Sequence, residues 1–306
     1  MEWSVYFQNP EFLERTRFHL IQPDMEPLVR KWCGVAEESR VLDVGCGTGY
    51  FTRLLAGEPA KEGGKQRLSV IGIDRELPFI EYAVKRNEKE GLPVSYVQGN
   101  ALELPFAEES FDIVASHTFL TVIPQPEKAL SEMLRVLRPG GILASVTPMS
   151  FLPEVMELGK YTPECTWANE YWSLYGVLNT AYHKINPYTE YVKGVKPALV
   201  PQFLAAHGLR KVSAYPLGKL FSLSNAYMTE EEKLEWITYY EMSELKKLDT
   251  FMELSQMNAL FTQEQAQRYR DLLQEKCAWL RSHLQENSVW EWSGGANLLV
   301  TGYKPA

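Results

Sequence analysis

Residues 41–49 read VLDVGCGTG, a run that could hold a nucleotide-like ligand. Residues 40–44 predict a buried strand, and an amphipathic helix with apolar side chains within residues 51–55 is predicted to follow it. Glycines suit the turn between strand and helix, because a ligand must approach the backbone closely and the turn needs φ values that a Cβ forbids. The free N–H groups at the start of the helix would favour a carboxylate or a phosphate.

The spacing of the glycines separates two classes of nucleotide site. A dinucleotide-binding turn has the pattern G-x-G-x-x-G, whose third glycine would fall at Tyr50. Glycines stand instead at positions 45, 47 and 49, which argues against a nicotinamide or flavin site. Asp74 follows the next apolar strand, residues 68–73. An acid there can accept both ribose hydroxyls of a nucleoside held at the switch point of a doubly wound sheet.

The elements that must position these residues follow along the chain. Further strands are predicted at residues 94–98, 111–116 and 142–146. Residues 126–137 carry apolar side chains at helical spacing, which predicts a helix. The sequence RPGG at 138–141 is expected to stop that helix before the next strand begins.

Five motifs in order resemble those of class I S-adenosylmethionine-dependent methyltransferases: DVGCGTG, the acid at position 74, GNALELPF, SFDIV and LRPGG. The nearest group is the UbiE-like one of quinone biosynthesis (methyltransferase type 11). The resemblance covers residues 40–148, roughly a third of the chain. It implies an α/β fold: a doubly wound, seven-stranded Rossmann-like sheet with strand seven antiparallel, together with helical insertions.

The resemblance also implies a site for S-adenosylmethionine, with S-adenosylhomocysteine as the product. The glycine turn would receive the amino-acid end of the cofactor, Asp74 the ribose hydroxyls and Asn100 the adenine. Many relatives carry Asp at the position of Asn100, but an amide oxygen still accepts a hydrogen bond from the exocyclic amine. The residues expected to bind the cofactor are Asp43, Gly45, Cys46, Gly47, Gly49, Asp74, Arg75, Asn100, Ala101, Leu102, His117 and Thr118.

A sulfonium donor already carries an activated methyl group. The protein must chiefly hold a nucleophile in line with that methyl, roughly 3–3.5 Å away, and exclude water. His117 is the catalytic candidate, since an imidazole accepts a proton near neutral pH. The alternatives are that His117 is a hydrogen-bonded polar residue at a strand end, or that no protein base is needed. No H-E-x-x-H motif or His/Cys cluster suggests a metal.

The expected core comprises residues 1–221 and 289–306, including an N-terminal helical cover at 1–38. Within this core, residues 151–195 follow the fifth strand and are rich in large aromatic side chains, which suit a lid over a flat or apolar acceptor. The alternative is a helix that packs these side chains onto the sheet. The residues expected to contact the acceptor are Tyr6, Phe119, Trp167, Tyr171 and Tyr175.

Strands six and seven are predicted at residues 211–216 and 296–303, and a long insertion at 222–288 separates them. Two pairs have the spacing of a capping box at a helix start: Thr229 with Glu232, and Thr262 with Gln265. The insertion is therefore expected to be a helical subdomain that either closes the site or forms a dimer interface.

Composition limits the partners of this 306-residue chain. A net charge of −8 argues against electrostatic binding to nucleic acid or to anionic membranes. The four cysteines are widely spaced without a C-x-x-C pair, which indicates reduced thiols. The polar N-terminus is no signal peptide, and no apolar run is long enough to span a bilayer. We therefore expect a cytoplasmic protein.

These observations favour a methyltransferase, monomeric or homodimeric, that moves the sulfonium methyl to an O, N, S or C nucleophile of a small, partly apolar metabolite. One alternative is a methyltransferase acting on a protein or RNA, for which the insertion at 222–288 could supply a recognition surface. RNA is disfavoured by charge and by the sequence HTFL, which stands after the fourth strand in place of an N-P-P-Y-type motif. The other alternative is a non-catalytic protein that binds S-adenosylmethionine.

Overall fold

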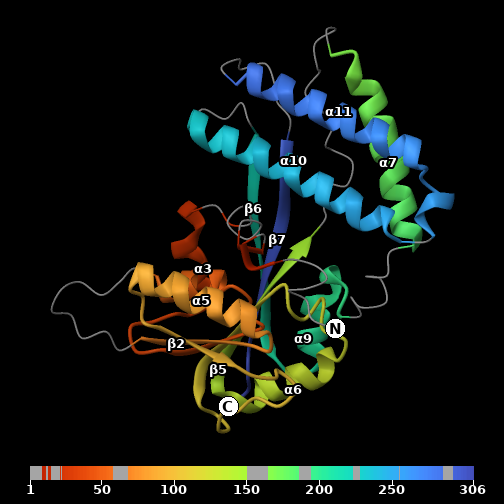
Figure 1. The fold of residues 1–306 in the computed structure, drawn as a ribbon. Coiled ribbons are helices and arrows are strands. Elements are labelled where there is room, and N and C mark those ends of the chain that lie inside the picture. The colour runs from red at the N-terminus through yellow and green to blue at the C-terminus, as the bar shows by residue number, and fades with distance from the viewer. Residues whose placement is uncertain are drawn as a thin grey trace. The chain divides into compact units, whose positions relative to one another are not determined.

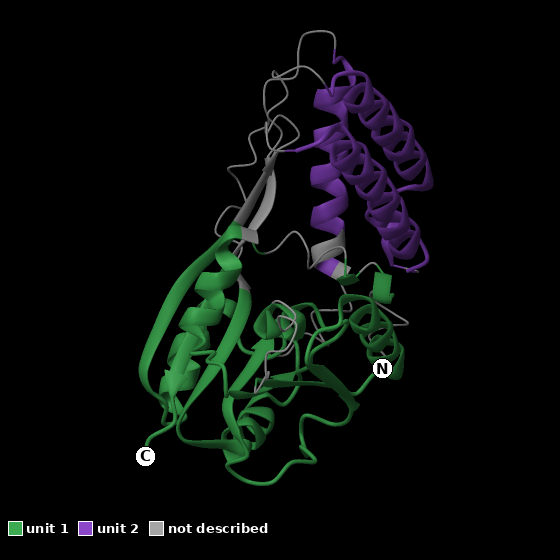
Figure 2. Cartoon of the chain, turned by 90° about the vertical axis from the view of Figure 1, so that its left-hand side faces the viewer, with its two compact units in different colours: residues 1–152, 191–219, 294–306 green, residues 153–190, 220–293 purple. Residues whose placement is uncertain are grey.

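The computed structural model describes residues 9–11, 13–14, 21, 23–57, 68–149, 165–185, 194–222, 228–254, 256–284 and 292–306. The chain divides into two compact units (Figure 2). Unit 1 contains residues 1–152, 191–219 and 294–306, and unit 2 contains residues 153–190 and 220–293. Most of the aromatic segment at 151–195 thus falls in the same unit as the long insertion, whereas the segment was expected to belong to the core.

Unit 1 is built on a seven-stranded sheet with the order β3-β2-β1-β4-β5-β7-β6 (Figure 1). The pairs among β1 to β5 are parallel, and β7 runs antiparallel to β5. This topology confirms the expected doubly wound sheet with an antiparallel seventh strand. The strands are β1 (Arg40–Val44), β2 (Ser69–Asp74), β3 (Val94–Gln98), β4 (Phe111–His117), β5 (Leu137–Met149), β6 (Arg210–Ser222) and β7 (Trp292–Tyr303).

Apolar side chains on both faces of the sheet explain why helices cover it on both sides. Val41 belongs to one buried cluster with residues of α3 and α4, whereas Leu42 and Val44 belong to a second cluster with residues of α6 and α9. Because neighbouring residues of a strand point to opposite faces, the two clusters lie on opposite sides of the sheet. Among the described residues, the helices of unit 1 include α3 (Glu26–Trp32), α4 (Tyr50–Ala56), α5 (Leu77–Glu90), α6 (Pro126–Val136) and α9 (Val200–Ala206), with short 3₁₀ turns at Pro23–Met25 and Pro197–Leu199.

The strand order places a switch point beside β1. From β1 the chain adds β2 and β3 outward in one direction, and it then returns to place β4 on the other side of β1. Ligands of doubly wound sheets bind in the crevice that such a reversal leaves at the carboxyl ends of the strands. The glycine turn, Asp74 and His117 all lie at that edge, at the ends of β1, β2 and β4.

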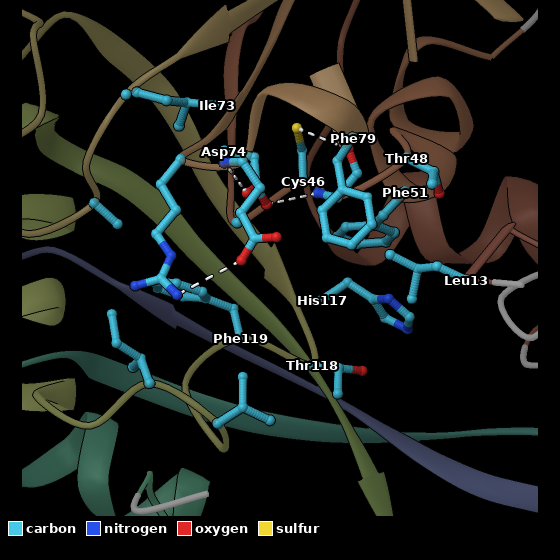
Figure 3. Close-up of a pocket in the computed structure, with 18 of the residues that line it drawn as sticks. Leu13, Cys46, Thr48, Phe51, Ile73, Asp74, Phe79, His117, Thr118 and Phe119 are labelled. Atoms are coloured by element: carbon cyan, nitrogen blue, oxygen red, sulfur yellow. Dashed lines mark hydrogen bonds and ion pairs between the residues drawn. The ribbon is translucent and has the colours of Figure 1, made fainter. Parts of the chain in front are cut away.

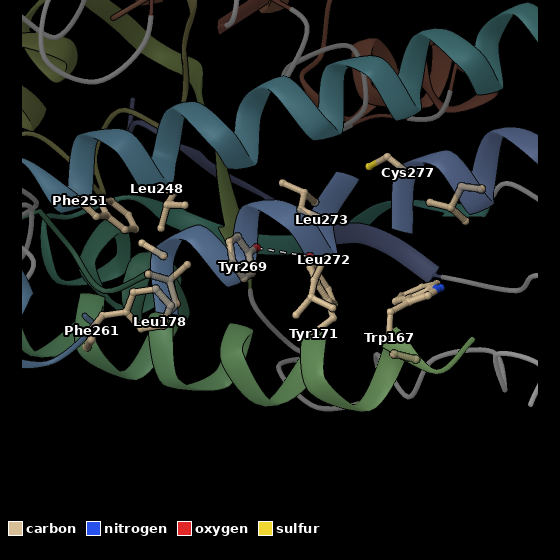
Figure 4. Close-up of a cluster of buried hydrophobic side chains, with 14 of the residues drawn as sticks. Trp167, Tyr171, Leu178, Leu248, Phe251, Phe261, Tyr269, Leu272, Leu273 and Cys277 are labelled. Carbon is tan, nitrogen blue, oxygen red and sulfur yellow. Dashed lines mark hydrogen bonds between the residues drawn. The ribbon is translucent and has the colours of Figure 1, made fainter. Parts of the chain in front are cut away.

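Unit 2 is helical. The helices described in this unit are α7 (Trp167–Ile185), α10 (Glu230–Met252) and α11 (Gln263–Ser282), with a 3₁₀ turn at Met257–Ala259. Both predicted capping boxes are present: the hydroxyls of Thr229 and Thr262 each accept the backbone N–H three residues on, and the Glu or Gln side chain reaches back. A shared apolar core that includes Tyr171, Tyr269 and Leu272 joins the three helices (Figure 4).

Candidate functional site

The glycine turn between β1 and α4 is fixed by the end of β2. The N–H groups of Gly45 and Cys46 both donate to the carbonyl of Ile73, at 2.8 and 3.0 Å. Gly45, Gly47 and Gly49 all have positive φ, at 72°, 53° and 81°. A Cβ on Gly45 would also overlap the Phe119 ring, so this position needs glycine for both its conformation and its space.

Asp74 faces the turn from the end of β2. Its Oδ2 accepts the N–H of Gly47 at 2.9 Å, and its Oδ1 accepts the N–H of Glu76 at 3.0 Å. Burial raises the pKa of Asp74, and the two backbone hydrogen bonds oppose that rise. Because each carboxylate oxygen offers more than one lone pair, Asp74 keeps acceptor capacity toward the pocket (Figure 3).

Asp43 lies behind the turn and is fully buried. The Thr52 hydroxyl donates to its Oδ2 at 2.6 Å. Burial, with a contribution from the nearby Asp74 charge, raises the pKa of Asp43 to about 7 although the Thr52 hydrogen bond lowers it. Asp43 therefore joins the end of β1 to α4 behind the turn, and it is not among the described residues that line the pocket described next.

A pocket of about 300 Å³ opens over the ends of β1, β2 and β4 (Figure 3). Ten of the predicted site residues line it together: Gly45, Cys46, Gly47, Asp74, Arg75, Asn100, Ala101, His117, Thr118 and Phe119. They come from four separate parts of the sequence. These four segments therefore meet at one pocket, and the binding of a cofactor by these residues stays a prediction.

The remaining predicted residues lie elsewhere or outside the described chain. Gly49 and Leu102 are absent from the described residues that line the pocket, although each is close in sequence to residues that do. Trp167, Tyr171 and Tyr175 pack within the helical core of unit 2 and not in this pocket. Tyr6 lies outside the described residues.

The end of β4 contributes two polar residues with unusual surroundings. His117 is 8% exposed, and its ring packs at 5.7 Å from the ring of Phe51. Thr118 has a φ of 54°, a left-handed conformation that β-branched residues rarely adopt. Its N–H donates to the carbonyl of Val146 at 2.8 Å, which helps hold that conformation. Strained backbone of this kind gathers at functional sites.

Sequence reasoning missed much of the apolar lining. Side chains from three places line the pocket without having been predicted, among them Leu13, Phe79, Val122, Ile123 and Pro124. None carries a chemical signature, and their separation in sequence hides their common surface. The position of residues 122–124 after the fourth strand was the available signal, because loops at the carboxyl ends of such strands border the ligand.

The described residues hold no obvious metal site or membrane helix. Within the ranges given above, no group of three or more His, Cys, Asp or Glu side chains could hold a metal ion. No helix in this part of the chain combines the length and hydropathy that crossing a bilayer requires. All four cysteines are buried and none is in a disulfide bond.

The segment that carries most of this pocket is similar to known proteins. Residues 42–145 match a family model described as a methyltransferase domain (Methyltransf_11). A demethylmenaquinone methyltransferase of Renibacterium salmoninarum is 37% identical over 110 residues, covering 36% of this chain and 41% of that protein. A sterol 24-C-methyltransferase of Pneumocystis carinii is 30% identical over 145 residues, covering 47% of this chain and 37% of that protein. The chain thus matches less than half the length of either relative.

Solved structures resemble the chain only moderately. The YcgJ protein of Bacillus subtilis aligns with a TM-score of 0.49 at 17% identity, covering 93% of this chain and all of that one. Phosphoethanolamine N-methyltransferase 2 of Haemonchus contortus, in complex with S-adenosyl-L-methionine, aligns with a TM-score of 0.48 at 19% identity, covering 99% and 56%. Identification therefore depends on the family model and the sequence relatives. Residues 42–145 of this chain form a methyltransferase domain of the class I, S-adenosylmethionine-dependent type.

Proposed function

We propose that this chain binds S-adenosylmethionine in the pocket of unit 1 and transfers its sulfonium methyl group to a small, partly apolar metabolite. One observation carries the proposal: the glycine turn of the methyltransferase domain and Asp74 line the same pocket at the switch point of the sheet. A nucleoside needs both a backbone that it can approach closely and an acceptor for its ribose hydroxyls.

Each part of the pocket suits one part of the cofactor. Gly45 and Gly47 leave room for the amino-acid end, and the carboxylate of Asp74 can accept the ribose hydroxyls. Asn100 and Ala101 would border the adenine, whose exocyclic amine can donate to the Asn100 side chain. These assignments are supported by the resemblance and by the position of each residue around the pocket.

When bound, the sulfonium supplies an activated methyl group, so the chain's own task is placement. Phe119 and the residues 122–124 give the pocket an apolar side that would exclude water and hold the acceptor's carbon skeleton. His117, at the end of β4, is our candidate to take a proton from an acceptor that must lose one. Its packing against Phe51 fixes the ring close to the pocket.

The acceptor class is inferred from the chain's relatives and its charge. The matching relatives are named for demethylmenaquinone and for a sterol, both largely apolar small molecules. The net charge of −8 disfavours a polyanionic acceptor such as RNA. We also propose a cytoplasmic location, since the four buried cysteines form no disulfide bonds.

Calorimetric titration with S-adenosylmethionine, S-adenosylhomocysteine and NADH tests the cofactor. Micromolar binding of both sulfur nucleosides without binding of NADH would support the proposal, and binding of NADH alone would overturn it. Asp74→Asn should weaken S-adenosylhomocysteine binding about tenfold or more, because one ribose acceptor is lost. The control is Asp24→Asn, which removes an exposed carboxylate outside the pocket.

A further inference from the structure

Arg53 is a buried cation directly beneath the glycine turn. It lies on α4, its side chain is 7% exposed, and its Nη1 donates to the carbonyl of Thr48 at 2.8 Å. Its Nε pairs with Glu90 at the end of α5, at 3.1 Å. The guanidinium therefore holds the turn through one nitrogen while another is fixed to a neighbouring helix.

The third nitrogen of Arg53 reaches the N-terminal part of the chain. Its Nη2 donates to Glu14, whose side chain is 14% exposed. The preceding residue, Leu13, is 5% exposed and lines the pocket. A Cβ on Gly47 would lie only 3.0 Å from Cδ2 of Leu13, so Leu13 rests directly on the glycine turn.

We propose that the ion pair between Glu14 and Arg53 is a latch that keeps Leu13 over the turn and slows the release of a nucleoside from the pocket. This inference rests on the proposed function, because the nucleoside is the methylation cofactor or its product. Glu14 and Arg53 act as positioning residues, since Leu13 lines the pocket and they hold it there.

The charge balance makes Glu14 suited to such a role. Arg53 faces two carboxylates, Glu14 and Glu90, so loss of the Glu14 charge leaves the guanidinium still paired. A buried cation left without any partner would destabilise the fold, whereas this arrangement lets the N-terminal contact break alone. Because the side chains of Arg53 and Glu14 are both largely buried, salt screens their interaction only weakly.

The test measures dissociation of S-adenosylhomocysteine from the full chain by surface plasmon resonance. In Glu14→Gln the dissociation rate should rise about tenfold, as expected for loss of a charge-assisted hydrogen bond, while the association rate changes little. The matched control is Glu11→Gln, which removes the same charge from an exposed position on the same segment and should leave both rates unchanged. Thermal unfolding of each variant checks that the fold is retained.

The outcomes separate the latch from the proposed function. If the unmodified chain fails to bind S-adenosylhomocysteine, both are overturned. If it binds, and Glu14→Gln releases the ligand at the unmodified rate, the latch alone is overturned. If Glu14→Gln does not fold, amide hydrogen exchange on the unmodified chain decides the question. The latch requires slower exchange at residues 11–14 when S-adenosylhomocysteine is bound, and equal exchange with and without it overturns the latch.

Discussion

Replacing Asp43 by Asn should change how the stability of this protein depends on pH. Asp43 is fully buried and its pKa is raised to about 7, against 3.8 for an ordinary aspartate. Between those two pH values the folded protein keeps a proton that the unfolded chain has released. The unfolded state therefore binds fewer protons, and the free energy of unfolding falls as pH rises through this window.

The size of the effect follows from the two pKa values. One pKa unit corresponds to about 1.4 kcal/mol, so the folded protein loses up to about 4 kcal/mol between pH 4 and pH 8 because of Asp43 alone. Asp43→Asn removes the titration, and its amide oxygen can still accept the hydrogen bond from Thr52. The variant should match the unmodified protein near pH 4 and be the more stable of the two near pH 8.

Urea unfolding at pH 4, 6 and 8 measures this difference, with Asp24→Asn as the control for an exposed carboxylate. The stability difference between Asp43→Asn and the unmodified protein should grow steadily across the series, whereas the control should show no such growth. A difference that is the same at all three pH values would refute the argument, because it would mean that Asp43 ionises alike in the folded and unfolded states.

Three further substitutions test other parts of the structure. Gly45→Ala should weaken S-adenosylhomocysteine binding at least about tenfold in calorimetry, whereas Gly140→Ala, with the same positive φ but open space around it, should leave binding intact. Thr118→Asn should raise the free energy of urea unfolding by about 1 kcal/mol, because Asn tolerates a left-handed conformation; a loss of stability would contradict the strain. Tyr269→Phe should lower the free energy of unfolding by about 1–3 kcal/mol, because the Tyr269 hydroxyl donates to Glu244 at 2.9 Å. An unchanged free energy of unfolding would show that this hydrogen bond adds nothing to stability.

The sequence predicted which segments meet at the glycine turn because the signals for these segments are local. A strand, a turn with three spaced glycines and an acid at the end of the next strand together fix which backbone edges meet. The capping boxes in unit 2 are local in the same sense, since each requires residues only three apart. Such patterns depend only on residues close together in the sequence, so they can be recognised without knowledge of the tertiary contacts.

The features of the fold that could not be predicted from the sequence depend on residues far apart in the chain. Aromatic residues at helical spacing in α7 show that one face is buried, but the side chains that bury it belong to α10 and α11, more than forty residues away. The sequence RPGG at 138–141 predicts a break before the fifth strand, yet β5 already begins at Leu137. There, Gly140 and Gly141 exchange backbone hydrogen bonds with Lys304 near the C-terminus, a contact that no local pattern encodes.

Features that cost stability gather around the same pocket. Asp43 is an acid buried behind the glycine turn, Thr118 holds a left-handed conformation at the end of β4, and Arg53 is a buried guanidinium beneath the turn. A protein optimised for stability alone would replace each of them, because burial of charge and backbone strain both oppose folding. Their convergence on one switch point is what a ligand site requires, since binding groups must be held in place before the ligand arrives. These buried and strained groups are an observation separate from the family match, and two of them, Asp43 and Thr118, are also among the residues predicted to bind the cofactor.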